Sequence, residues 1–218
     1  MNAALLIVLT AFVTLSTTAL TGQLLPGDAA VRDLVLAHAS EPVVSTFKLI
    51  NYAGSWEFLL PAVLLLFLLP RARQCWWVWP ALMIIAPILE GVAKELIGRP
   101  RPEGHAMGFP SGHATAAAAY FAALIYASGD LPALARRVIR AGAAAMIVLV
   151  AVARIILRAH WPSDVLGGIA LGLACAIAAV LIAASFVRPG PARSGSRQPT
   201  ARDGPSKLGP ASRPQAQG

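Results

Sequence analysis

Long apolar runs separated by short polar clusters make up most of this chain. A helix needs about 20 predominantly apolar residues to cross a bilayer. Runs of roughly this length occur at residues 3–25, 49–69, 76–97, 112–128, 137–157 and 163–187. Polar residues dilute the start of the second run, and the fourth is short but uncharged through its alanine-rich part. The pattern predicts an all-α polytopic membrane protein, a bundle with six transmembrane helices.

Composition supports this interpretation. Hydrophobic residues make up 57% of the 218-residue chain and charged residues only 13%, and the mean hydropathy is +0.66. Such a chain cannot cover a water-soluble domain with polar surface. The net charge of +8 belongs largely to loops and tail, so it is weak evidence for nucleic-acid binding.

Two segments differ from the spans. Between Pro26 and Phe47, apolar residues at positions 31, 34, 35 and 39 have helical spacing, which predicts a helix along the membrane surface that could roof a site. Residues 189–218 are rich in Pro, Gly, Ser and Arg, which predicts a disordered basic tail after a transmembrane domain at 1–188. The first run could instead be a cleaved secretory signal, although no basic residue precedes it.

The basic residues outside the spans predict the orientation, because short cytoplasmic loops are enriched in Lys and Arg. With the N-terminus inside, eleven of the eighteen Lys and Arg residues are cytoplasmic: Arg71, Arg73, Arg136, Arg137, Arg140, Arg188, Arg193, Arg197, Arg202, Lys207 and Arg213. We therefore expect a multi-pass plasma-membrane protein with both termini in the cytoplasm. The polar clusters described next then share the outer face.

The first cluster lies at the end of the third run. Lys94 precedes Arg101-Pro102 by seven residues, and Gly98, Pro100 and Pro102 predict that the helix ends near Ile97. Arg101 then lies on a loop that can fold back over Lys94. Taken alone, this cluster could equally be a snorkelling lysine beside a positively charged loop.

The second cluster, Pro110-Ser111-Gly112-His113, stands at the start of the fourth run. Ser111 can cap that helix, its first-turn N–H groups can bind an anion, and Gly112 lets an oxyanion approach the backbone. By itself the tetrapeptide could be a simple helix cap.

The third cluster spans the connection between the last two runs. Arg154 ends the fifth run, and His160 precedes Asp164 by four residues. This spacing lets the carboxylate accept the proton of one imidazole nitrogen and leaves the other nitrogen nucleophilic. Asp164 could otherwise be a helix-dipole partner in a first turn capped by Ser163. Together the three clusters supply three cations, two histidines and a carboxylate, which suits phosphoryl transfer without a metal.

In order and spacing, the clusters resemble the signature of the type 2 phosphatidic acid phosphatase superfamily, which also contains vanadium haloperoxidases and bacterial acid phosphatases. Lys94 with Arg101-Pro102 matches its first motif, Pro110 to His113 the second, and Arg154, His160 and Asp164 the third. One position departs: Ala153 stands where the family has a serine that helps to hold phosphate. The missing hydrogen bond is worth about 0.5–1.5 kcal/mol.

The resemblance implies a role for each matched residue. His160 would attack phosphorus to give a phosphohistidine, Asp164 would orient it, and His113 would protonate the leaving oxygen and then activate water. The phosphate oxygens would be held by five groups: Lys94, Arg101, Ser111, Gly112 and Arg154. No metal or other cofactor is expected.

The implied function is an integral membrane phosphatase that hydrolyses a lipid phosphate or diphosphate. Family substrates include undecaprenyl diphosphate, phosphatidic acid and phosphatidylglycerol phosphate, and the motifs do not separate them because they grip the shared phosphate. Partners are the lipid substrate and membrane lipids; nucleic acid and an obligate protein partner are not expected. Two alternatives remain, a phosphotransferase that passes the phosphoryl group to a lipid or sugar, and a non-catalytic lipid carrier.

Overall fold

The computed structural model describes residues 2–104 and 107–186, and these residues are almost entirely helical. The predicted tail at 189–218 lies outside the described residues. The elements are α1 (Ala3–Leu20), α2 (Asp28–Leu36), α3 (Glu41–Tyr52), α4 (Trp56–Leu66), α5 (Pro70–Arg73), α6 (Val78–Ile97), α7 (Gly112–Ala127), the 3₁₀ turn η1 (Ser128–Asp130), α8 (Ala133–Ile156) and α9 (Pro162–Phe186).

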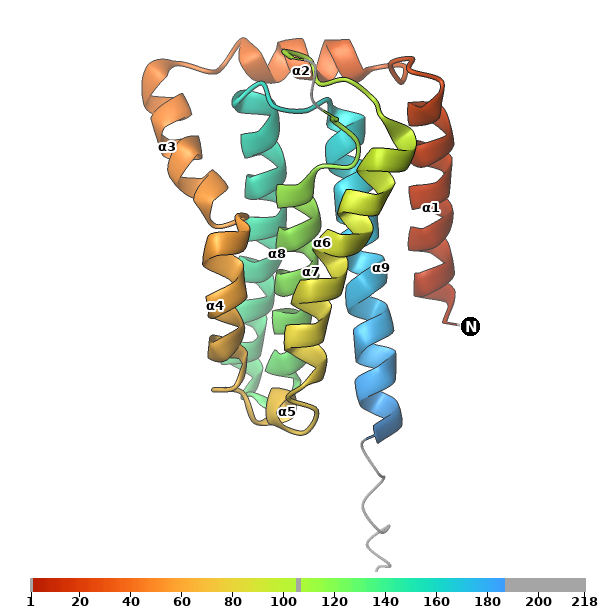
Figure 1. Cartoon of the computed structure of the whole chain (residues 1–218). Helices are drawn as coiled ribbons and strands as arrows, with labels where there is room; N and C mark the ends of the chain where they lie inside the picture. The colour runs from red at the N-terminus through yellow and green to blue at the C-terminus, as the bar shows by residue number, and fades with distance from the viewer. Residues whose placement is uncertain (1, 105–106, 187–218) are drawn as a thin grey trace, which may run out of the picture. The chain divides into compact units, whose positions relative to one another are not determined.

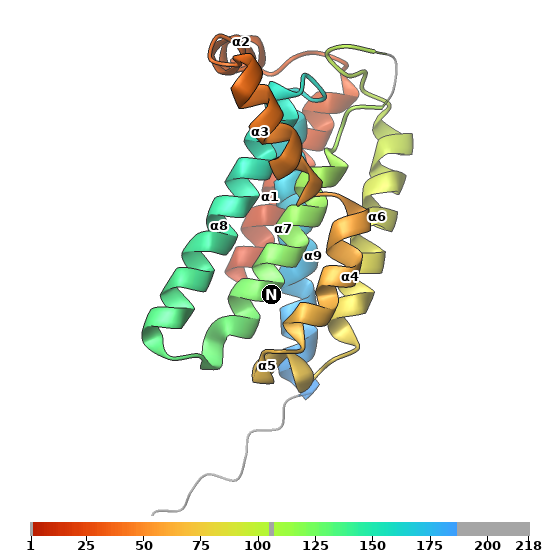
Figure 2. The same cartoon turned by 90° about the vertical axis from the view of Figure 1, so that its left-hand side faces the viewer.

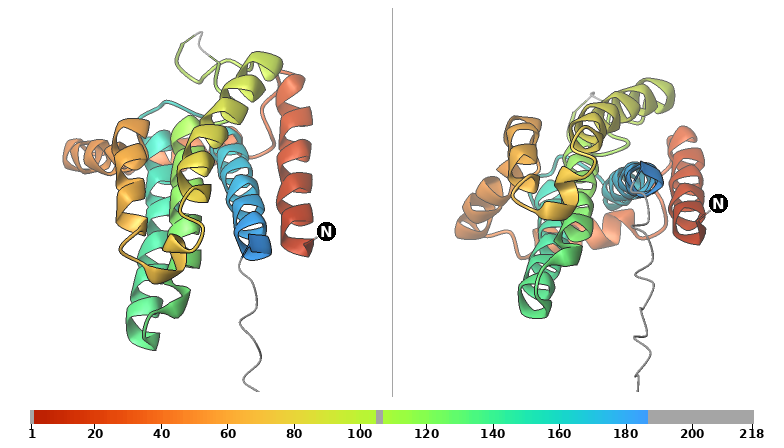
Figure 3. Two further views of the ribbon diagram at one scale, coloured as in Figure 1. Left: turned by 60° about the horizontal axis from the view of Figure 1, so that its bottom comes forward. Right: turned by 90° about the horizontal axis from the view of Figure 1, so that it is seen from below.

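Helix α7 is the centre of the bundle. It packs against α4, α6, α8 and α9, which run alongside it (Figures 1 and 2). Helix α1 lies at the edge, next to α9 (Figure 3). The surface helix predicted between Pro26 and Phe47 is present as α2, which crosses one end of the bundle (Figure 1). It is shorter than the predicted connection, since α3 begins at Glu41.

Among the described residues, three helices, α1, α8 and α9, are long and apolar enough to cross a membrane. The pair α3 and α4 would be a fourth span, although it is bent by 54°. Predicted spans 76–97 and 112–128 correspond to α6 and α7, which do not meet these criteria. Helix α6 carries Glu90, Lys94 and Glu95 near its end. Helix α7 has only 16 residues, about 24 Å at 1.5 Å per residue, against a hydrocarbon core of about 30 Å.

The predicted span at 49–69 is not one straight helix. Helix α3 ends at Tyr52 and α4 starts at Trp56, so the chain turns at residues 53–55. A Cβ atom added to Gly54 would lie 2.5 Å from Val150 Cγ1, which places the turn directly against α8. The break therefore occurs where only a glycine allows the chain to approach that helix closely.

Glycines on α9 bring it unusually close to α7. A Cβ atom added to Gly168 would lie 2.4 Å from the Ser111 carbonyl oxygen, and one added to Gly172 would lie 2.3 Å from the Thr115 carbonyl oxygen. The side of α7 that faces these glycines carries Ala114 and Ala118, both fully buried. Small residues spaced four apart are a common way for membrane helices to pack backbone against backbone. This contact sets the start of α7 against the start of α9.

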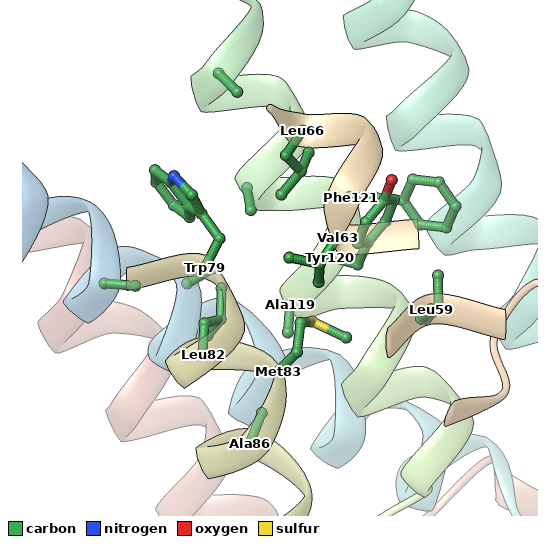
Figure 4. Packing of buried hydrophobic residues seen from close by; sticks show 14 of the residues in the cluster. Leu59, Val63, Leu66, Trp79, Leu82, Met83, Ala86, Ala119, Tyr120 and Phe121 are labelled. Carbon is green, nitrogen blue, oxygen red and sulfur yellow. The ribbon is translucent and has the colours of Figure 1, made fainter. Parts of the chain in front are cut away.

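An apolar cluster between α4, α6 and α7 fixes the other side of α7 (Figure 4). Its two large polar-tipped side chains have partners, as burial requires. Trp79 Nε1 donates to the Ala72 carbonyl at 2.9 Å, and the Tyr120 hydroxyl donates to the Ala62 carbonyl at 3.0 Å. These bonds join α6 to α5 and α7 to α4, so the helices that carry the polar clusters are held in register.

Candidate active site

His160 and Asp164 form a buried pair at the start of α9. His160 lies in the turn after α8, and Asp164 lies in the first turn of α9. The two are 1% and 0% exposed, and His160 Nδ1 lies 3.7 Å from Asp164 Oδ2. This contact is electrostatic, because the separation exceeds hydrogen-bond length. With Nδ1 turned toward the carboxylate, Nε2 is the nitrogen available for attack.

The pKa of His160 is lowered from its ordinary value, because burial disfavours the charged imidazolium. Arg154 and Arg101 lower it further by their positive charge, and these effects outweigh the Asp164 carboxylate, which raises it. The imidazole is therefore neutral at neutral pH, which is the form that can act as a nucleophile.

Arg154 lies in the last turn of α8, and it is buried. Its Nη1 donates to Asn51 Oδ1 at 2.7 Å, so α3 holds the guanidinium. Its Nε is buried and has no hydrogen-bond partner among the described residues. A guanidinium fixed on one side with a free N–H on the other is suited to an oxyanion. Ala153, where the family motif has serine, is fully buried beside it.

Ser111, Gly112 and His113 begin α7. Ser111 occupies the N-cap position, as predicted, but its side chain makes no capping bond. Its hydroxyl is buried without a hydrogen-bond partner among the described residues, which leaves it available to a ligand. The backbone N–H of Ser111 donates to the Asp164 carbonyl at 3.0 Å. The ring of His113 interacts electrostatically with His160 and Arg154, so this cluster and the third one lie together.

Lys94 and Arg101 approach from α6 and the loop that follows it. Helix α6 ends at Ile97 with a left-handed Gly98 as C-cap, which confirms the predicted end. Lys94 forms an ion pair with Glu90 one turn earlier, and its charge acts on His113. The Nε of Arg101 donates to the Met107 carbonyl at 3.4 Å, which folds the loop back.

Gly112 is tightly enclosed, because a Cβ atom there would lie 2.9 Å from Glu90 Oε1. The second cluster therefore lies against Glu90, the ion-pair partner of Lys94, as well as against the third cluster. The structure thus places all eight predicted residues at one end of the bundle, around the starts of α7 and α9 and the ends of α6 and α8. Three cations, free N–H and O–H donors and a neutral histidine in one place can bind a phosphate and attack it.

Three residues near the site, two of them buried and Asn51 partly buried, were not predicted as site residues, and one prediction was wrong. Asp28, Arg99 and Asn51 contact Asp164 or Arg154 directly or through one neighbour. Their contacts join positions 65 or more residues apart, so no local spacing could have indicated them. Ser163 does not cap α9: it is the second residue of that helix, and its hydroxyl contacts Asp28 and Arg99.

In residues 2–104 and 107–186, no three His, Cys, Asp or Glu side chains are grouped so that they could hold a metal ion.

Comparison of the sequence with known proteins and protein families finds a match to a family of known proteins. Residues 76–188, more than half of the chain, match the model of the PAP2 superfamily. Phosphatidylglycerophosphatase B of Bacillus subtilis is 31% identical over 140 residues, which cover 57% of this chain and 67% of that protein. Decaprenylphosphoryl-5-phosphoribose phosphatase of Mycobacterium tuberculosis is 34% identical over 126 residues, which cover 53% of this chain and 65% of that protein.

The fold also has a solved counterpart. The crystal structure of a transmembrane PAP2-type phosphatidylglycerolphosphate phosphatase from Bacillus subtilis superposes with a TM-score of 0.74. The match covers 86% of this chain and 99% of that chain at 24% sequence identity. At this identity the likeness shows a shared fold, that of a helical membrane protein.

Proposed function

Because the chain belongs to the PAP2 superfamily of membrane lipid phosphatases, we propose that it hydrolyses a lipid phosphate through a phosphohistidine formed at His160. The observation that carries this proposal is the convergence of His160, His113 and three cations at one end of the bundle. A carrier that only gripped headgroups would need the cations but neither histidine.

The first step is attack by His160 Nε2 on phosphorus. The N–P bond forms as the P–O bond to the lipid breaks. Asp164, 3.7 Å from Nδ1, stabilises the positive charge that develops on the imidazole. His113 gives its proton to the departing oxygen, since a lipid alkoxide is a poor leaving group.

In the second step water attacks the phosphohistidine. His113, now neutral, accepts a proton from that water, and inorganic phosphate leaves as the N–P bond breaks. His160 returns to its neutral form, and His113 is again protonated for the next cycle. Both steps pass through a phosphoryl group that carries its charge on three equatorial oxygens.

The remaining predicted residues hold those oxygens. Arg154, Arg101 and Lys94 supply positive charge, and the Ser111 hydroxyl and Gly112 N–H supply donors at the start of α7. Donors and charges fixed before the reaction stabilise charge in the transition state without reorganising, and this is usually the largest catalytic contribution. We propose that these groups take the place of a metal ion.

The distribution of basic residues supports a membrane orientation. Arg71 on α5 and Asp130 on η1 form an ion pair of 3.6 Å, and α5 lies at the end of the bundle opposite to α2 (Figure 1). The basic residues of this end favour a cytoplasmic location for it. We therefore propose six spans in the plasma membrane, with α6 and α7 crossing alongside the apolar helices and the site facing outside.

A substrate panel tests the function. Purified protein in detergent, without added Mg²⁺, should release inorganic phosphate from at least one of phosphatidylglycerol phosphate, phosphatidic acid or undecaprenyl diphosphate. Phosphatidylglycerol phosphate comes first because of the relative in Bacillus subtilis. Label transferred to a lipid or sugar instead of water would indicate a phosphotransferase, and no cleavage across the panel would favour a carrier.

Variants test the two histidine roles. His160→Gln should abolish turnover and the acid-labile phosphoenzyme, while His38→Gln, at an exposed position on the outer connection, should leave both unchanged. His113→Gln should slow cleavage of a lipid ester more than cleavage of an activated aryl phosphate, whose leaving group needs no proton. Equal losses on both substrates would refute the acid role of His113.

A further inference from the structure

A buried network of charged residues lies directly behind Asp164. Arg99 Nη1 donates to Asp164 Oδ1 at 3.0 Å and to Ser163 Oγ at 2.7 Å, and Arg99 Nη2 donates to Asp28 Oδ2 at 3.0 Å. None of these four residues is more than 4% exposed. Removing one charged side chain from such a network is strongly destabilising, because it leaves a buried charge unpaired.

Asp28, which lies on α2, also caps the N-terminus of α9. Its Oδ1 accepts the backbone N–H of Ser163 at 2.8 Å, and its Oδ2 accepts the Ser163 hydroxyl at 2.6 Å. A carboxylate that accepts first-turn N–H groups stabilises a helix N-terminus. The roof helix α2 is thus fastened to the turn of α9 that carries Asp164.

These contacts determine how Asp164 faces the nucleophile. Arg99 donates a hydrogen bond to Asp164 Oδ1, and the backbone N–H of Trp161 donates to Asp164 Oδ2 at 2.9 Å. The carboxylate is held at both oxygens, and Oδ2 remains the one that faces His160 Nδ1. Rotation of the carboxylate away from His160 would break both bonds.

The network also determines how much negative charge His160 experiences. One guanidinium is shared by two carboxylates, so Asp28, Arg99 and Asp164 together carry one net negative charge. Without Asp28, the positive charge of Arg99 would be balanced by Asp164 alone. Asp164 would then stabilise an imidazolium less effectively.

We propose that Asp28 and Arg99 are positioning residues of the active site, which fix the orientation and effective charge of Asp164 and thereby the nucleophilicity of His160. This inference rests on the proposed function, in which His160 attacks phosphorus. It assigns to the roof helix a part in the reaction that neither family motif nor local spacing indicates.

The direction in which each variant shifts the pKa of His160 tests the proposal, because a purely structural role would not give opposite shifts. The charged groups that face His160 are Arg154 from α8, Arg101 from the loop after α6, His113 from α7 and Asp164 from α9. Substitutions in the network leave all of them in place. Asp28→Asn removes a negative charge and should lower the pKa of His160, whereas Arg99→Gln removes a positive charge and should raise it.

The pKa can be measured without substrate. The chain contains four histidines, so ring-¹³C-labelled protein in detergent gives four imidazole signals to titrate by NMR, assigned with single His→Gln variants. We expect opposite shifts of about half a pH unit for Asp28→Asn and Arg99→Gln. The signal of exposed His38 should stay constant in both, as an internal control.

Glu103→Gln is the matched control. It also changes a carboxylate to an amide and also breaks a contact to α2, the 2.8 Å ion pair with Arg32. Because Glu103 is exposed and solvent screens its charge, the pKa of His160 should not change. Shifts of the same sign in Asp28→Asn and Arg99→Gln, or an equal shift in Glu103→Gln, would overturn the proposal.

Kinetics supply the second readout. Asp28→Asn should lower kcat about tenfold with KM within a factor of two, because Asp28 supports the nucleophile and touches no phosphate ligand. Unchanged kcat would contradict the proposal. Arg99→Lys keeps the charge in case Arg99→Gln does not fold, and it should restore the pKa of His160 but not full kcat, since one ammonium lacks the two-armed geometry of guanidinium.

The two proposals fail in different ways. A wild-type protein that cleaves no lipid phosphate refutes the proposed function, and the NMR titration still decides whether Asp28 and Arg99 control His160.

Discussion

Gly168→Ala tests whether the close approach of α9 to α7 builds the active site. The added Cβ atom would lie 2.4 Å from the Ser111 carbonyl oxygen, 3.0 Å from Ala114 Cβ and 3.2 Å from the Thr115 nitrogen. Two of these atoms are backbone, so no side-chain rotation relieves the overlap. Ordinary contact requires about 1 Å more separation, which moves the start of α7 away from α9.

That displacement acts directly on the chemistry. Ser111, Gly112 and His113 move with the start of α7, whereas His160 and Asp164 move with α9. A misplacement of about 1 Å can reduce turnover about 100-fold, and overpacking costs about 1–3 kcal/mol of stability. We expect Gly168→Ala to fold, to lose about 100-fold in kcat and to unfold at a lower temperature.

The assay compares phosphate release in detergent with thermal unfolding followed by tryptophan fluorescence. Gly142→Ala on α8 is the control, because an added Cβ atom there meets nothing within 4 Å. It should keep wild-type turnover and, by improving helix propensity, should not lower the unfolding temperature. If Gly168→Ala behaved like Gly142→Ala in both measurements, the close-contact argument would be refuted.

Three further predictions follow from the site and the orientation. Asn51→Leu removes the acceptor at 2.7 Å from Arg154, so kcat/KM should fall about tenfold; an unchanged value would show that α3 does not hold the guanidinium. Because burial lowers the pKa of His160 in the free protein and only the neutral imidazole attacks, the acid limb of the kcat/KM–pH profile, which reports the free enzyme, should lie below the ordinary histidine pKa of 6.5; a limb above 6.5 would contradict this. The orientation can be tested by cysteine labelling in a background without the two native cysteines. Asp33→Cys on α2 should react with an impermeant maleimide on intact cells, whereas Asp130→Cys on η1 should react only after permeabilisation. The reverse result would invert the proposed orientation.

Local sequence rules predicted the parts of the site that depend on neighbours in the chain. Gly98 and Pro100 indicated the end of α6, and the helix does end at Ile97. The four-residue spacing between His160 and Asp164 indicated a pair, and their side chains do face one another. The helix across the end of the bundle followed from its apolar period.

Contacts between distant segments could not be predicted in this way. No local spacing indicates a role for Arg99, since its partner Asp28 is 71 residues earlier. Asn51 looked like a polar interruption of a span, whereas its amide holds Arg154 across 103 residues. The bend between α3 and α4 was missed because apolar content alone does not show where a helix turns against its neighbour.

The level of the site in the bundle has a kinetic consequence. The candidate reactive groups lie at one end of the bundle, and in the membrane orientation that we propose this end meets the headgroup layer. An amphiphile can then present its phosphorus there without withdrawing its chains from the hydrocarbon. The rate should then follow the mole fraction of substrate within the micelle or bilayer, not its molarity in the whole sample. Diluting the substrate with inert detergent at constant total lipid should therefore slow the reaction.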